Sequence, residues 1–470
     1  MRKPRILFLC HNHPSLHAGG TEIFAHDLFR EFDRDGLVDA MFLGCTNRVH
    51  REQKPGTNFQ TVGRSANEVV MWTGHFDRFF QSQIDLHGIV PEFAEFLRAF
   101  RPDVVHFHHT LLMGVETLFL VRRTLPDAKI VLTLHDYYSI CTNDGQMVTT
   151  GERRLCSGAS PDACHRCFPG IGTDQFLLRE RHIKNMLSLV DVFVAPSAFL
   201  RDRYIAWGLD PSRIVIIRNG LPSVDRTPHR FAPLVPQLAP PADWAPAGRR
   251  RRFGRLGGLF NGGRGEDLAD AVPTVRRDAF GYFGNVNPFK GATVALDAAR
   301  RLRAAGEERF SLRVHGGMAF QTDAFKAEFA EALDGAGSNA VHLGPYQRED
   351  VPDLMLPIDW VVVPSIWWEN APLVILEAFH HRRPVICSGI GGMAEMVQDG
   401  VNGLHVRPND PHSLMEAMDR AINTPGLWDR LVSNIRPVPT ITDCMNEHLD
   451  LYEALVVPPA VPALTAGSAS

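Results

Sequence analysis

Short apolar runs alternate with stretches of helical periodicity in two successive series along this chain, and this alternation constrains the fold more than any other feature. Continuous apolar runs of this length are typical of strands that are buried on both faces of a sheet. Strands that alternate with helices predict a parallel sheet covered by helices, and two series predict two α/β domains. The apolar runs lie at 5–10, 103–110, 129–136, 190–197 and 213–220, and then at 279–283, 310–317, 340–346, 359–365 and 383–388.

The domain boundaries follow from changes in composition, because 470 residues are too many for one compact core. Rossmann-like domains are expected at 1–222 and 274–438. Residues 223–273 are rich in Pro, Arg and Gly, which is typical of a linker or an insertion. An amphipathic helix is expected at 439–456, packing back toward the first domain, and a disordered tail at 457–470.

Charge and hydropathy exclude several classes of partner. The net charge of -4 gives no general attraction to nucleic acid. The apolar runs are too short for a signal-peptide core or a membrane span, so we expect a cytoplasmic protein, with peripheral contact at the inner face of the membrane as an extension of that interpretation. The arginine run at 249–252 is interpreted as a solvated linker, with contact to anionic lipid or a polyphosphate carrier as the alternative.

The stretch SIWWENAPLVILEAF at 365–379 places two acids around the start of a helix. Pro372 suits the first helical position, so the following amides should point out of the helix N-terminus, where phosphate binds. Glu377 then lies about one turn inside the helix, roughly 6 Å along at 1.5 Å per residue, and Glu369 lies on the loop before it. Two hydroxyl-binding acids on either side of a phosphate site match a nucleotide-sugar.

This stretch resembles the E-x7-E signature of retaining glycosyltransferases of family 4, which have the GT-B fold: two Rossmann-like α/β domains that face each other across a cleft. Other segments resemble motifs of the same family, in the same order along the chain. They are the glycine pair after the first strand, TLHD at 133–136, FGNVNPFKG at 283–291 and GGMAEMVQDGVNGLHV at 391–406.

The resemblance implies transfer of a sugar from a nucleotide-sugar donor to a glycan or lipid-linked acceptor, with no cofactor required for catalysis. Glu377 is expected to hold the ribose, and Glu369 the hydroxyls of the sugar. Lys290 is expected to neutralise the leaving diphosphate, and His135 to contact the sugar from the first domain. Backbone contacts to the donor are expected at Gly19, Gly20, Asn370, Ala371 and Leu373.

The chain departs from the family pattern at Asn285, where an arginine is usual. Asparagine carries no charge, so Lys290 would be the lone cation at the leaving group unless an arginine arrives from elsewhere. A non-catalytic homologue that binds sugar or lipid, and an epimerase of the same fold, therefore stay open as alternatives. The sequence does not fit a dinucleotide-dependent oxidoreductase, because the loop HNHPSLHAGG after the first strand lacks the G-x-G-x-x-G motif.

Histidines and cysteines raise the question of metal sites. His106, His108 and His109 lack an evident acidic partner, so we expect them to line the cleft and not to bind metal. Cys141, Cys156, Cys164 and Cys167 are spaced C-x14-C-x7-C-x2-C in a loop with few apolar residues. One structural zinc ion would explain how this loop stays ordered, and four free thiols or one reversible disulfide are the alternatives.

Overall fold

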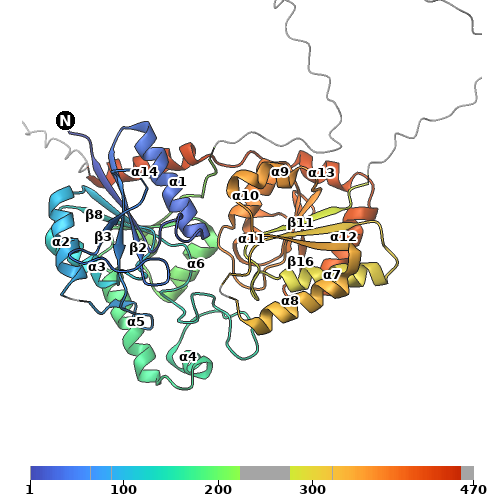
Figure 1. The fold of residues 1–470 in the computed structure, drawn as a ribbon, viewed down its shortest axis with the longest axis horizontal. Coiled ribbons are helices and arrows are strands. Elements are labelled where there is room, and N and C mark those ends of the chain that lie inside the picture. The colour runs from blue at the N-terminus through green and yellow to red at the C-terminus, as the bar shows by residue number, and fades with distance from the viewer. Residues whose placement is uncertain (1, 64, 86, 223–275, 320, 457–470) are drawn as a thin grey trace, which may run out of the picture.

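The computed structural model describes residues 2–456 except 64, 86, 223–275 and 320, and not 457–470. The expected insertion at 223–273, with its arginine run, and the expected tail therefore lie outside the described residues. Figure 1 shows two α/β halves side by side, the first in blue to green and the second in yellow to orange. Each half is built around its own sheet, as the two series of apolar runs predicted.

The first half has a sheet of eight strands in the order β10-β9-β8-β7-β1-β2-β4-β3. Its neighbouring strands pair in parallel, except that β3 is antiparallel to β4. The sequence prediction omitted β2, β3 and β4. The elements are β1 (Arg5–Cys10), α1 (Gly20–Asp35), β2 (Asp39–Thr46), β3 (Phe59–Thr61), β4 (Glu68–Trp72), β5 (Phe76–Asp77), β6 (Ser82–Gln83), α2 (Ile89–Phe100), β7 (Val104–Phe107), α3 (Glu116–Thr124), β8 (Lys129–Thr133), α4 (Pro161–Cys167), α5 (Thr173–Leu187), β9 (Val192–Ala195), α6 (Ala198–Trp207), the 3-10 turn η1 (Pro211–Arg213) and β10 (Ile214–Ile216).

The second half has a fully parallel sheet of six strands in the order β13-β12-β11-β14-β15-β16. Its strands are short. The strands β11, β14 and β15 are fully buried, as expected where helices cover both faces, whereas the edge strand β13 exposes Val341 and Leu343. The elements are β11 (Ala279–Phe283), α7 (Ala292–Ala304), β12 (Ser311–His315), α8 (Asp323–Ala336), η2 (Gly337–Asn339), β13 (Ala340–Gly344), η3 (Arg348–Asp350), α9 (Val351–Met355), β14 (Trp360–Val363), α10 (Leu373–His380), β15 (Val385–Ser388), α11 (Gly391–Met396), β16 (Gly403–Val406), α12 (Pro411–Asn423) and α13 (Leu427–Ser433).

The last helix, α14 (Ile441–Val456), follows the second half in sequence but packs on the first half beside α1 (Figure 1). Tyr452 joins the buried cluster that contains Phe8 and Phe32. The segment that enters α14 also pairs with the end of the first half, because Leu221 and Thr440 form a parallel bridge. The two crossings between the halves therefore lie against each other.

Polar contacts also join the two halves near the carboxyl ends of the strands. The carboxylate of Glu395, on α11, accepts hydrogen bonds from the amides of Ala198 and Phe199 at the start of α6, at 3.1 and 3.0 Å. An acid at a helix N-terminus satisfies free amides and complements the helix dipole. Among the described residues, no helix is both long and apolar enough to cross a membrane.

Candidate active site

A cleft of about 650 Å³ lies between the two halves, at the loops that leave the carboxyl ends of β1, β8, β11, β12 and β14. Ligands of open α/β sheets bind at this end of the strands. All ten residues that the sequence placed at the donor or in catalysis line this one cleft. They are Gly19, Gly20, His135, Asn285, Lys290, Glu369, Asn370, Ala371, Leu373 and Glu377.

The helix that carries the second acid begins at Leu373, one residue later than the sequence predicted. Pro372 is its N-cap, with an extended backbone (φ -63°, ψ 120°), and its carbonyl accepts from the Ile375 amide at 3.0 Å. The first amides of a helix have no partner inside the helix. Leu373 and Val374 both line the cleft, so the positive end of the α10 dipole faces it.

Glu369 is buried, and one of its oxygens accepts three hydrogen bonds. Oε1 accepts from Lys290 Nζ at 2.7 Å, from Ser365 Oγ at 2.8 Å and from Trp367 Nε1 at 2.8 Å. These bonds fix the carboxylate group and leave Oε2 for another donor. They also show that Lys290, the expected partner of the diphosphate, is paired with Glu369.

Glu377 also lines the cleft and is half-buried, and desolvation raises the pKa of its carboxyl group, although the positive charge of Arg348 opposes the shift. Arg348 itself forms an ion pair with Asp27 on α1, so the pair spans the cleft. The sequence analysis did not identify either member of this pair. It brings a second cation into the cleft, within electrostatic range of Glu377.

Two glycines allow the loops around Glu369 to approach one another closely. Gly291 has a φ of +73°, and a Cβ atom there would lie 2.0 Å from the carbonyl oxygen of Pro364. A Cβ atom on Gly392 would lie 1.5 Å from the carbonyl oxygen of Asn370. The Gly392 amide donates to the carbonyl of Glu369 at 2.7 Å. The GGMAEM segment therefore packs against the backbone of the E-x7-E loop and holds it in place.

His135 forms the opposite wall of the cleft, directly after β8. Its backbone carbonyl accepts a hydrogen bond from Asn370 Nδ2 at 2.5 Å, which joins the two halves at the centre of the site. Its ring Nε2 lies 3.0 Å from Nδ1 of His108. Burial lowers the pKa of His135 to about 3, so the imidazole is neutral at physiological pH. It can donate or accept one hydrogen bond in the cleft but carries no charge.

The glycine pair lies at the start of α1, where Gly19 is the N-cap and Gly20 the first helical residue. A Cβ atom on Gly19 would lie 2.4 Å from Oε2 of Glu22. Glu22 is buried and forms an ion pair with His11 at 3.0 Å. Burial opposes both charges, but their mutual attraction prevails: the pKa of Glu22 falls to about 2 and that of His11 rises well above its usual value. A buried ion pair thus holds the base of this loop.

The prediction that His106, His108 and His109 line the cleft is wrong, since none of the three is among its lining residues. His106 is fully buried, with Nδ1 2.6 Å from the hydroxyl of Tyr452 and Nε2 2.7 Å from that of Thr133. Periodicity within a strand identifies residues that share a face, but it cannot tell which face a later helix will cover. Here α14 covers it.

A different trio brings three metal-ligand atoms within 4.8 Å of one another among the described residues: His13, His26 and Glu68. The amide of Ser15 donates to His13 Nδ1 at 3.2 Å, which places the proton of a neutral His13 on Nε2, 3.1 Å from Glu68 Oε2. Arg30 donates to the other oxygen of Glu68 at 3.2 Å. The carboxylate is already satisfied by these donors, so the trio is best described as a hydrogen-bonded ion cluster.

The four cysteines surround a separate cavity, away from the lining of the cleft. All four are free thiols. No three of their sulfur atoms lie within 4.8 Å of one another, so the structure gathers the four side chains around one space without bringing them to a common point.

Comparison with known proteins agrees with the geometry of the cleft. The profile described as Glycosyltransferase Family 4 matches residues 18–223, and the profile described as Glycosyl transferases group 1 matches residues 277–424. A D-inositol 3-phosphate glycosyltransferase of Salinispora arenicola is 30% identical over 359 residues, which are 72% of this chain and 68% of that protein. This chain belongs to the family 4 glycosyltransferases. The residues matched by the two profiles include loops that line the cleft of this glycosyltransferase.

Two further relatives define how far the similarity extends. The α-D-kanosaminyltransferase of Streptomyces kanamyceticus is 27% identical over 158 residues, which are 34% of this glycosyltransferase and only 40% of that protein. The structure of Anabaena HepE in complex with UDP and glucose superimposes with a TM-score of 0.61 at 17% identity and covers 96% of this chain and 99% of that one. The expected GT-B fold is therefore confirmed.

Proposed function

We propose that this enzyme is a retaining glycosyltransferase that moves a sugar from a nucleoside diphosphate-sugar to a hydroxyl group of a growing polysaccharide or a lipid-linked glycan. One observation carries the proposal. The cleft presents two acids, Glu369 and Glu377, on either side of the α10 N-terminus, with Lys290 paired with Glu369 and with His135 on the wall of the first half.

The positions of these groups suggest how a donor is bound. Glu377, within electrostatic range of Arg348, accepts the hydroxyls of the ribose. The diphosphate lies at the amides of Leu373 and Val374, where the helix dipole favours negative charge. The sugar then reaches Glu369, whose Oε2 accepts its hydroxyls. In this arrangement Lys290 moves from Glu369 to the diphosphate when the donor enters, while Asn285 lies beside it as a neutral hydrogen-bond donor.

The proposed transfer keeps the configuration of the anomeric carbon. The acceptor hydroxyl attacks that carbon from the face that the diphosphate leaves, the bond from the carbon to the phosphate oxygen breaks, and a phosphate oxygen takes the acceptor's proton. The products are a glycoside and a nucleoside diphosphate. Lys290 and the α10 amides stabilise the charge that develops on the leaving group, a form of electrostatic catalysis. The proposal needs no cofactor for this step.

The acceptor side is the first half of the chain, where Gly19 and Gly20 allow the acceptor to approach. We place the reaction in the cytoplasm, with the protein in peripheral contact with the inner face of the membrane when the acceptor is lipid-linked. The proposed acceptor class follows from the family resemblance, so it is tested separately from the donor.

A thermal-shift panel of UDP-, GDP- and ADP-sugars tests the donor, because a ligand at 100 times its Kd stabilises the native state by about 2.7 kcal/mol. We expect one base to raise the Tm clearly above the others. Transfer is then followed as a new glycosidic bond by NMR, with the α-anomeric signal reporting retention. If no sugar nucleotide raises the Tm, the donor site is wrong. Binding without a new bond would favour the non-catalytic homologue, and an altered sugar on the nucleotide would favour the epimerase.

A further inference from the structure

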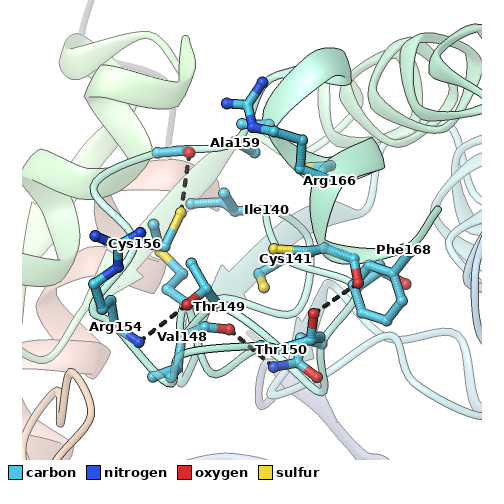
Figure 2. A pocket seen from close by; sticks show the side chains of 18 of the residues that line it. Ile140, Cys141, Val148, Thr149, Thr150, Arg154, Cys156, Ala159, Arg166 and Phe168 are labelled. Atoms are coloured by element: carbon cyan, nitrogen blue, oxygen red, sulfur yellow. Dashed lines mark hydrogen bonds between the residues drawn. The ribbon is translucent and has the colours of Figure 1, made fainter.

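The loop at 141–168 leaves the first half directly after the strand that carries His135, and its four cysteines surround a cavity of about 410 Å³. Figure 2 shows Cys141 and Cys156 facing this cavity, with the Cys156 thiol turned toward a backbone oxygen. Cys164 and Cys167 lie three residues apart on α4, so they share one face of that helix. Residues far apart in the loop thus place all four thiols around one space.

The loop is only partly packed against the core of the first half. Met147 and Val148 are buried, whereas helix α4 has no buried residue. The hairpin before α4 is held by the bridge between Val148 and Leu155 and by further backbone hydrogen bonds, and the Thr150 hydroxyl connects it to α4 by donating to the carbonyl of Cys167 at 2.6 Å. Because α4 lacks buried apolar contacts, its local stability is low, and a cross-link there would contribute to its order.

A buried cation lies beside the thiols. Arg179, on α5, is 3% exposed and donates to the backbone carbonyls of Phe79, Ser139 and Tyr138, at 2.7, 2.9 and 2.7 Å. These partners are neutral. Burial lowers the pKa of Arg179, and Cys141 and Cys164 act against that shift, which places both sulfur atoms within electrostatic range of the guanidinium group. Burial nevertheless raises the pKa of the Cys141 thiol to about 11 and that of the Cys164 thiol above its usual value, so a metal ion has to displace the protons of both thiols.

We propose that Cys141, Cys156, Cys164 and Cys167 bind one Zn²⁺ ion per chain as thiolates. Zinc prefers four such ligands in a tetrahedron, each sulfur about 2.3 Å from the metal. Binding releases the thiol protons to solvent and requires the Cys156 side chain to turn from the carbonyl of Gly158, to which its thiol now donates at 3.1 Å. The ion closes the loop without the oxidant that a disulfide would need.

The zinc loop contacts the catalytic loop of the other half, and this part of the inference rests on the proposed function. The carbonyl of Cys156 accepts a hydrogen bond from Trp368 Nε1 at 3.0 Å, and Trp368 directly precedes Glu369. Arg203 joins the same contact, because it donates to the carbonyl of Ser157 at 2.6 Å and lies 4.7 Å from the Trp368 ring centroid. Zinc at Cys156 would therefore fix a carbonyl that positions the sugar-binding acid.

Metal content is the direct test and does not depend on glycosyl transfer. Protein purified without chelator from zinc-supplemented medium should contain one Zn²⁺ per chain by elemental analysis. Replacement by Co²⁺ should give the visible d–d bands of a tetrahedral site and the near-ultraviolet bands of thiolate ligation. The double variant Cys164→Ser/Cys167→Ser should lose the metal. The matched control Cys444→Ala, which removes a buried thiol of α14, should keep it.

Several results would overturn the site. They are substoichiometric zinc with four loop thiols that react under native conditions, two disulfides found by mass spectrometry, or a cobalt spectrum without thiolate bands. The wild-type measurements decide the question by themselves, so the proposal can be refuted even if the double variant fails to fold.

The link to the active site is tested by enzyme kinetics. We expect zinc removal and Trp368→Phe each to raise the KM for the donor by roughly two- to tenfold, as for one lost hydrogen bond. Because both changes break the same contact, their combined effect should be no larger than either effect alone. If the two effects on KM are additive, the zinc loop does not act through Trp368. If the zinc-loaded wild type transfers no sugar, the result counts against the proposed function and not against the zinc site.

Discussion

Replacing Glu369 with glutamine separates the two functions that the structure combines in one carboxylate. Lys290 Nζ lies 2.7 Å from Glu369 Oε1 in the structure, and the lysine side chain is 30% exposed. The donor must break this pair to recruit Lys290 to the diphosphate. Glu369→Gln should therefore abolish transfer, since the sugar loses its charged partner, but should tighten the binding of free nucleoside diphosphate.

The size of the effect follows from the geometry. A hydrogen bond to a charged group contributes about 1.5–3 kcal/mol, whereas an exposed ion pair contributes about 0.2–1 kcal/mol. Because water reaches Lys290, we take about 1 kcal/mol, which corresponds to a roughly fivefold lower Kd. Isothermal titration with the nucleoside diphosphate selected by the thermal-shift panel measures it. Glu349→Gln is the matched control, because Glu349 lines the same cleft and is exposed. If Glu369→Gln weakens nucleotide binding, Lys290 does not exchange partners as described.

Three further changes test other parts of the cleft. Glu377→Gln should weaken nucleotide binding by about 1.5–3 kcal/mol, roughly ten- to 150-fold, yet raise the Tm of the free enzyme at pH 8. The sign follows from the raised pKa of Glu377: the unfolded carboxyl ionises at its ordinary pKa and the folded one only at a higher pKa, so the fold loses stability as the pH rises between the two. The Tm gain of the variant should therefore shrink as the pH falls from the raised pKa toward the ordinary one, and a gain that is constant with pH would contradict the argument. Asn285→Arg should tighten nucleoside diphosphate binding more at 0.01 M than at 1 M salt, because the screening length falls from about 30 to about 3 Å; no change at low salt would place this loop away from the diphosphate. Gly392→Ala should cut the transfer rate by about a hundredfold, as expected for a 1 Å displacement near the chemistry, whereas Gly170→Ala, which meets open space, should have no effect; equal rates would mean that the Asn370 backbone yields easily.

The sequence predicted best those features that lie in contiguous stretches at the ends of strands. The E-x7-E stretch, the Lys290 loop, the histidine motif and the glycine pair each lie on the loop that follows a strand, and parallel sheets bring such loops to one edge. Their convergence on one cleft therefore needed no knowledge of packing. By contrast, Arg348 and Asp27 are 321 residues apart in separate halves, and nothing local marks either one as part of a pair.

The remaining errors have a physical cause: they depend on packing contacts between residues that are far apart in the sequence. His106 looked like a cleft residue because it lies near the end of a strand, but a helix from the far end of the chain supplies its partner, Tyr452. The strand β2 did carry an apolar run, DAMFLGCT, and could have been found from it. The edge strand β3 has three residues, too few for an alternating pattern to stand out.

The paired crossings between the halves determine how this enzyme can be recombined with its relatives. The amide of Leu221 donates to the carbonyl of Pro439 at 3.0 Å, and the amide of Ile441 donates back to the carbonyl of Leu221 at 2.8 Å. A Cβ atom on Gly220 would lie 2.2 Å from the carbonyl oxygen of Thr440. A chimera that exchanges the second half must therefore keep α14 with the first half and take both hydrogen-bonded segments, around Leu221 and around Thr440, from one parent. A simple fusion after Leu221 would strip the apolar face around Phe8 and Phe32 of its native cover, so the natural unit of exchange is an internal cassette and not a terminal half.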